Sequence, residues 1–255
     1  MATFTGSDDL TGATFTDADL SGARFVGCDL PRVVMRGVAM EAAEIDAPWL
    51  FEGDTFLRVN GVVVIAVVVA ELIRRFPGRS ERRAANPAAR RAAWAALERT
   101  WATTVERAAA MPPGTVDTSV AGEWSFAQTL RHLVLATDMW LGKAVLEIEQ
   151  PFHPLGIGDA SMADEGWDMS VFTTRTPSYA EVLGARAERL AMVRDFLARV
   201  TVDDLAAERP NPHDPDYQET TLNCVQVILE EEWEHHRYAV RDLDAIESAA
   251  EPISG

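Results

Sequence analysis

The sequence predicts a mainly α protein, in which a four-helix bundle follows about two coils of a small right-handed β-solenoid. Two observations support this fold class. An apolar residue recurs at every fifth position near the N-terminus, and four later segments show the spacing of amphipathic helices. The expected organisation is a repeat segment over residues 1–52, a connector over residues 53–85 and a helical domain over residues 86–250.

The repeat starts at Leu10, and the residue two places earlier is mostly small. A period of five fits neither a helix nor a strand, but it fits a square β-helix that points two of every five side chains inward. We therefore expect Cys28 inside the repeat. The large apolar positions are Leu10, Phe15, Leu20, Phe25, Leu30, Met35, Met40, Ile45 and Leu50.

The segments GATFT, ADLSG, GARFV and GCDLP resemble the pentapeptide-repeat family. In long acidic members of that family the repeat mimics duplex DNA against topoisomerases. Nine repeats make only about two coils, which bury too little surface to fold alone. We therefore interpret the segment as a stabilising cap.

The connector contains the apolar stretch Gly61–Ile73, GVVVIAVVVAELI. It is shorter than the roughly 20 residues of a membrane span, and Glu71 interrupts it. We expect a buried strand or helix that joins the two domains. Proteins that combine these two domains tend to have acidic residues and a proline there, so the apolar version indicates a tighter interface or a homodimer contact.

Four helices are expected in the second domain. Pro87 suits the first turn of a helix that ends near Ala110, and Ser125 is a good N-cap for a helix over 125–147. Ser178 caps a third helix over 178–200, and a fourth covers 221–247. Four such helices favour a bundle. The long loop over 148–177 is of the kind that covers functional sites.

Composition excludes several classes of function. The formal net charge of −17 disfavours nucleic acid and anionic membranes as partners. Only two cysteines occur, far apart, and the N-terminal MATFTGSDDL lacks the features of a signal peptide, so we expect a cytoplasmic protein. No phosphate-binding loop or serine nucleophile elbow is visible, which leaves a metal as the main catalytic candidate.

The last helix, ILEEEWEHHRYAVRDL, places a glutamate and a histidine on an otherwise apolar stripe. A buried Glu232 and His236 are costly unless they are paired or bind a metal. His132 has a similar position on the second helix, and together they would suit a divalent metal, most simply zinc, with Ni, Fe and Mn as alternatives. An exposed Glu232–His236 pair is the competing interpretation, and His235 is expected to be a partly exposed surface histidine. The stripe comprises Val225, Leu229, Glu232, His236, Ala239 and Leu243.

The segments EWSFAQTLRHLVLATDMWLG and EEEWEHHRYAVRDL resemble the DinB/YfiT superfamily, and the Glu-x-x-x-His version resembles its mycothiol-dependent maleylpyruvate isomerases. The resemblance implies a divalent metal bound by His132, Glu232 and His236. It also implies transfer of a low-molecular-weight thiol, mycothiol or a similar one, to a small electrophilic substrate, or a thiol-dependent isomerisation. The alternatives are a non-catalytic, metal-stabilised binding module and a degenerate bundle without metal.

Three loop residues are weaker candidates for substrate contact. His153 is either a loop ligand or a turn residue, while Trp167 and Asp168 either line a cavity or clamp the loop onto the bundle. Cys224 is expected to pack at the start of the last helix. No catalytic residue beyond the metal ligands is predicted.

Overall fold

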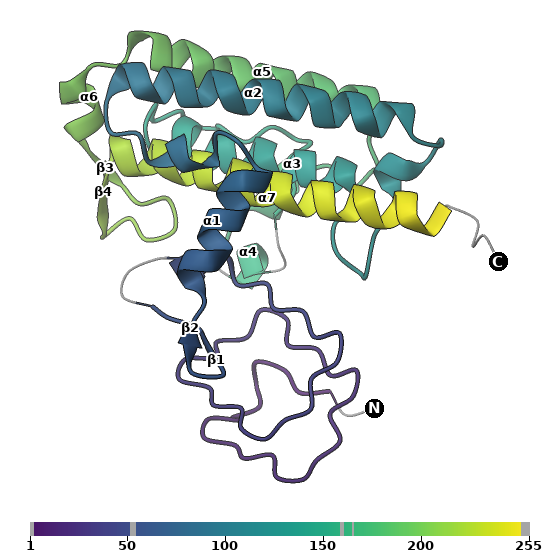
Figure 1. Cartoon of the computed structure of the whole chain (residues 1–255). Helices are drawn as coiled ribbons and strands as arrows, with labels where there is room; N and C mark the ends of the chain where they lie inside the picture. Colours follow the sequence, from purple (N-terminus) through teal and green to yellow (C-terminus); the bar gives the residue numbers. More distant parts are fainter. Residues whose placement is uncertain (1–2, 52–54, 159–160, 165, 251–255) are drawn as a thin grey trace. The chain divides into compact units, whose positions relative to one another are not determined.

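The computed structural model describes residues 3–51, 55–158, 161–164 and 166–250. The chain divides into two compact units, Met1–Asp46 and Ala47–Gly255 (Figure 1). The described part is mainly α-helical, as the sequence predicts, and contains two short two-stranded antiparallel sheets. Within these ranges no helix is long and apolar enough to cross a membrane.

The first unit has a five-residue period in its backbone. A residue with positive φ recurs at every fifth position from Gly12 to Ala42. Turns closed by hydrogen bonds from Ala13, Ala23 and Val33 to the carbonyls three residues earlier follow the same phase. Glycine occupies several of these left-handed positions, where it avoids the steric penalty of a side chain.

The predicted β-solenoid is not shown in this unit. Residues 3–46 contain turns and bends but no assigned strand. The repeated apolar side chains from Leu10 to Ile45, and Cys28, are exposed, so the expectation that they form a buried interior is not met. So few repeats offer little surface against which an interior could close.

The connector differs from its prediction. It contains the 3₁₀-helix η1 (Pro48–Phe51), the hairpin strands β1 (Arg58–Val59) and β2 (Val62–Val63), and helix α1 (Ile65–Arg75). The expectation of a buried element over Gly61–Ile73 is wrong, because α1 has no buried residue and Val67 is 67% exposed. A further 3₁₀-helix, η2 (Arg79–Arg83), packs on the following helices.

The predicted long helices are present. Helix α2 (Pro87–Ala110) has Asn86 as its N-cap, while α3 (Phe126–Thr137) begins with a capping box at Ser125. Helix α3 continues as the π-helical segment η4 (Asp138–Lys143). Helix α5 (Tyr179–Arg199) has a second capping box at Ser178, and α7 spans Thr221–Ala250. Each capping box satisfies backbone N–H groups that the first turn leaves unpaired.

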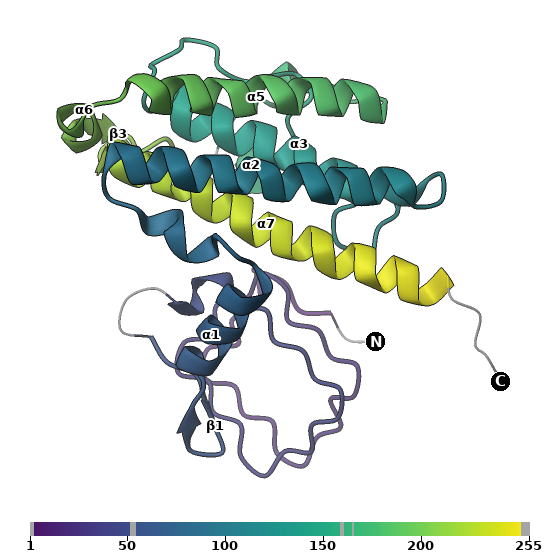
Figure 2. The ribbon, with the colours of Figure 1, turned by 45° about the horizontal axis from the view of Figure 1, so that its top comes forward.

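Helices α2 and α3 lie between α5 and α7. Both α2 and α3 pack against α5 on one side and α7 on the other (Figure 2). The main core lies between them and includes Trp94, Leu97, Leu130, Leu229 and Trp233, all nearly inaccessible to solvent. The six residues of the predicted stripe on α7 are all buried, which confirms the helical periodicity.

Short elements fill the remaining connections. The 3₁₀-helix η3 (Thr115–Asp117) precedes α3, and the loop before α5 contains α4 (Ser161–Asp164) and the 3₁₀-helix η5 (Met169–Val171). Helix α6 (Val202–Ala206) and the hairpin of β3 (Glu208–Pro210) and β4 (Gln218–Thr220) connect α5 to α7, with Arg209 opposite Glu219.

Candidate metal centre

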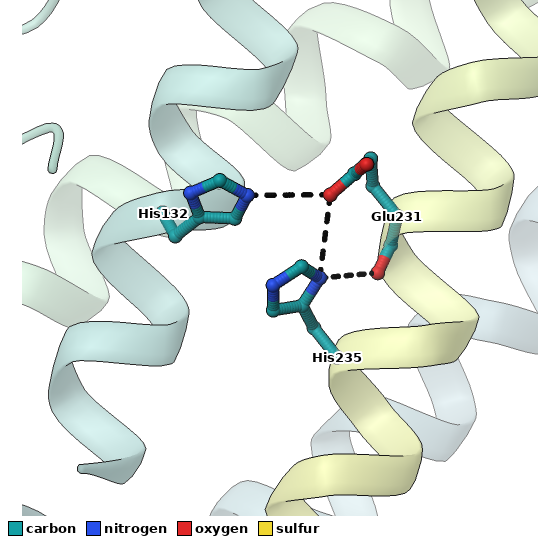
Figure 3. A group of neighbouring side chains, drawn as sticks. All are labelled: His132, Glu231 and His235. Carbon is teal, nitrogen blue, oxygen red and sulfur yellow. Dashed lines mark hydrogen bonds and ion pairs between the residues drawn. The ribbon is translucent and has the colours of Figure 1, made fainter. Parts of the chain in front are cut away.

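A cluster of potential metal ligands lies between α3 and α7. It comprises His132 from α3 and Glu231 and His235 from α7 (Figure 3). One ligand atom of each residue lies within 4.8 Å of the other two. Glu231 Oε2 is 3.2 Å from His132 Nε2 and 3.4 Å from His235 Nδ1. The side chains are 18%, 35% and 15% exposed for His132, Glu231 and His235, so the cluster is half-buried but open to solvent.

Two carbonyl groups orient the histidine rings. His132 Nδ1 lies 3.3 Å from the carbonyl oxygen of Ile157, and His235 Nδ1 lies 2.9 Å from that of Glu231. Because a carbonyl oxygen can only accept, Nδ1 of His132 donates in its contact, and Nε2 is the nitrogen that faces Glu231. Metal-binding histidines commonly donate their second N–H in this way. The orientation of the His132 ring therefore suits metal coordination.

The pKa shifts in the cluster favour an anionic Glu231 and a neutral His235 ring. Burial alone would raise the pKa of the Glu231 carboxyl, but the contact with His132 and the charges of the nearby histidines outweigh burial and lower it. Burial, and then the charge of His132, lower the pKa of His235 to about 4. A cation held between these groups would be attracted by the negative charge of Glu231.

Aromatic residues surround the cluster. The rings of His132 and His235 are 4.5 Å apart, and Trp124 lies 4.7 Å from the first and 6.2 Å from the second. His213, in the β3–β4 loop, is among the charges that lower the Glu231 pKa, and its ring is 5.9 Å from Trp140. The sequence interpretation missed Trp124 and His213. Neither lies on a periodic apolar stripe that would have indicated its position.

The structure does not bring the predicted ligands Glu232 and His236 to His132. Glu232 accepts hydrogen bonds from the guanidinium of Arg186 on α5, with 2.6 Å between Arg186 Nη2 and Glu232 Oε1. His236 Nε2 lies 2.8 Å from the hydroxyl oxygen of Thr104 on α2. Glu232 and the Nε2 of His236 thus have protein partners, which was the other possibility open to a buried polar pair, while His236 Nδ1 is buried without a hydrogen-bond partner.

The ligand cluster is therefore displaced by one residue from the predicted set. Glu231 and His235 have the same Glu-x-x-x-His spacing, but they lie at the edge of the buried stripe. His235 is partly exposed, as expected, but its ring lies against His132 and Trp124, so it belongs to the cluster. A position at the edge leaves room for exchange with solvent, which a position in the core does not.

The burial of Glu232 and His236 also shifts their proton equilibria. Burial raises the pKa of Glu232, although the charge and hydrogen bond of Arg186 oppose that effect. Burial lowers the pKa of His236 to about 4. His236 is therefore a neutral core residue at physiological pH.

The loop between η4 and α5 approaches the cluster through its backbone. The carbonyl of Leu155 accepts from Nε of Arg131 at 2.8 Å, and the carbonyl of Ile157, two residues later, contacts His132. His153 Nδ1 accepts from the Leu155 N–H at 3.1 Å, so His153 occupies a turn. The predicted loop thus lies beside the site and helps to orient His132.

The remaining predicted residues lie in the same loop or at the start of α7. Trp167 packs on Phe152, with the ammonium of Lys143 4.1 Å from its ring. Asp168 caps η5 by accepting from the N–H of Ser170. Cys224 is fully buried, and burial raises its pKa to about 11, which fits a packing role.

Comparison with known families agrees with this architecture. A model of pentapeptide repeats matches residues 9–43 in eight copies, and a model described as the DinB superfamily matches residues 96–239. No curated protein and no solved structure matches the chain. The second match covers more than half of the sequence and includes α3, α5 and the part of α7 that contains the cluster. The chain belongs to the DinB superfamily.

Proposed function

We propose that this protein is a metal-dependent enzyme that holds a divalent ion, most simply zinc, through His132, Glu231 and His235. The observation that supports this is the approach of three ligand atoms from two helices, together with the contact that directs His132 Nδ1 to the Ile157 carbonyl. Nickel, iron and manganese are alternatives, because two imidazoles and a carboxylate also suit them.

The donor set favours catalysis over a purely structural role. Three protein ligands leave coordination positions for water or substrate, whereas structural zinc sites are closed by four. A divalent ion supplies Lewis acidity that lowers the pKa of a thiol or of water. Glu231 contributes negative charge, and the Ile157 carbonyl fixes the ring of His132. Trp124 covers one side of both imidazoles.

The proposed reaction is transfer of a low-molecular-weight thiol, such as mycothiol, to a small electrophile, or a thiol-dependent isomerisation. Its support is the sequence resemblance to mycothiol-dependent relatives, together with the chain's own thiols. The chain has two cysteines, and Cys224 is buried with a raised pKa. A buried thiol with a high pKa is a poor nucleophile, so Cys224 is not expected to take the place of an added thiol.

Metal content is the first test. Protein purified without a His tag is expected to contain close to one equivalent of a divalent metal by elemental analysis. In calorimetric titrations of metal-free protein, E231Q and H235Q should bind zinc about 10- to 100-fold or more weakly than wild type, because each loses a ligand. The matched control is E106Q, at an exposed glutamate of α2, which should bind like wild type. Metal-free wild type that does not take up any divalent ion, or full affinity in E231Q, would overturn the metal site.

A second assay separates the enzyme from the binding module. Consumption of a small electrophile should require both the metal and an added thiol. A metal-loaded protein that ignores every thiol tested and still binds a ligand tightly would favour the non-catalytic alternative.

The fold proposal includes a DinB-type four-helix bundle preceded by a short pentapeptide β-helix. Support comes from the two family matches, from the pairwise packing of the long helices and from the five-residue recurrence of left-handed residues. A cytoplasmic location, a small-molecule substrate and a homodimer belong to the same proposal. The exposed apolar side chains of α1 support the homodimer, and sedimentation of the purified protein would test it.

A further inference from the structure

Helix α7 contains two overlapping Glu-x-x-x-His pairs. Glu231 with His235, and Glu232 with His236, have the same spacing and lie one residue apart. Successive residues of an α-helix are separated by about 100° around its axis. A rotation of α7 by that amount would present the second pair to α3 in place of the first. The local sequence of α7 therefore offers two similar ligand pairs, and residues elsewhere must decide which one meets His132.

The first such residue is Arg186 on α5. Its guanidinium contacts both carboxylate oxygens of Glu232, and the two side chains are only 5% and 1% exposed. If α7 turned so that Glu232 faced α3, Arg186 would lose its partner inside the protein. A buried charge without a partner is strongly unfavourable, so this ion pair opposes the rotation.

The second such residue is Thr104 on α2. Its hydroxyl is hydrogen-bonded to His236 Nε2, one helical turn after Glu232. The ring of His236 is also enclosed edge-on by aromatic residues, with ring centroids 5.0 Å from Trp101, 5.7 Å from Phe76 and 6.0 Å from Trp233. The second Glu-x-x-x-His pair is thus held at both of its polar ends by helices other than α3.

We propose that Arg186 and Thr104 are positioning residues that select the rotation of α7 in which Glu231 and His235 face His132. They touch neither the proposed metal nor its ligands, and they act through Glu232 and His236. Buried polar pairs are known to specify one register among alternatives of similar packing. This inference rests on the proposed metal function of the cluster, and the test below separates the two.

The test is the double variant R186M/E232L in the full-length chain. It replaces the ion pair by apolar side chains of similar length and leaves no uncompensated charge. The matched control is E98L/R194M. It removes a different ion pair, which joins α2 to α5, with 2.5 Å between Arg194 Nη2 and Glu98 Oε1. We expect about 10- to 100-fold weaker zinc binding in R186M/E232L, as for other residues that orient metal ligands, and unchanged binding in the control.

A metal-independent measurement accompanies the titration. In metal-free wild type the rings of His132 and His235 are close enough to give a nuclear Overhauser effect between their protons. This signal should weaken or disappear in R186M/E232L and persist in the control. R186K, which keeps a cation beside Glu232, should retain the signal and most of the zinc affinity. If the double variant does not fold, T104V replaces it. For T104V we expect a smaller loss of zinc affinity and a smaller loss of the His132–His235 nuclear Overhauser effect.

The outcomes are distinct. Wild-type zinc affinity and an unchanged His132–His235 signal in R186M/E232L would refute the positioning role, because apolar residues such as Leu229 and Trp233 would then set the rotation alone. Wild type that binds no metal would refute the proposed function, while the histidine signal would still decide whether Arg186 positions α7.

Discussion

Replacing Arg186 alone should destabilise the protein far more than replacing both members of its ion pair. In R186M the Glu232 carboxylate stays buried, at 0% exposure, without a counter-charge. Breaking a buried pair in this way costs about 3–5 kcal/mol, whereas exchanging both partners for apolar residues is often neutral. For a domain of roughly 200 residues, each kcal/mol lowers Tm by about 2–4 °C. R186M should therefore melt roughly 6–20 °C below wild type.

Urea unfolding followed by circular dichroism and tryptophan fluorescence measures this difference. R186M/E232L should be more stable than R186M, although it carries one more substitution. The exposed counterpart R194M should change the free energy of unfolding by about 1 kcal/mol or less, because Arg194 is more than half exposed. The reasoning fails if the free energy of unfolding of R186M is within about 1 kcal/mol of the wild-type value. It also fails if the loss of stability in the double variant equals the sum of the losses in R186M and E232L.

Two further predictions concern backbone freedom and pH. G78A should lower the free energy of unfolding by about 1–3 kcal/mol, because Gly78 has a φ of 98° and an added Cβ would lie 3.3 Å from the Trp233 ring. G184A, inside α5 with open space at its Cβ, should raise the free energy of unfolding by about 0.5–1 kcal/mol. Equal shifts of the two urea midpoints would contradict this. Burial raises the pKa of Asp138, against the opposing hydrogen bond of Arg189. A raised carboxyl pKa gives stability that is present below the unfolded pKa and lost as pH rises through the folded pKa. The stability advantage of wild type over D138N should therefore shrink from pH 4 upward, and an advantage that grew with pH would refute the direction.

The sequence determined the helical architecture because its signals are local. The caps at Ser125 and Ser178 and the proline at the start of α2 mark helix ends through interactions within one turn. The apolar spacing on α7 also placed Glu232 and His236 correctly in the buried stripe. Likewise, a period of five residues was visible in the sequence and recurs in the backbone of residues 12–42.

Burial of the five-residue repeat depends on contacts that a local period does not contain. The period specifies which side chains would share an interior, but not whether two coils suffice to close one. In the described part of the repeat the apolar side chains remain exposed. The same limit applies to α1, whose apolar sequence predicted burial, although its side chains do not reach the core.

The proposed metal site illustrates most clearly what tertiary structure adds. The sequence interpretation proposed His132 and a Glu-x-x-x-His pair on the last helix, but two pairs on α7 have that spacing. A buried carboxylate needs either a metal or a protein partner, and the choice depends on Arg186, 46 positions earlier in the chain. Only the tertiary structure brings Arg186 of α5 to Glu232 and Thr104 of α2 to His236, while Glu231 and His235 face His132.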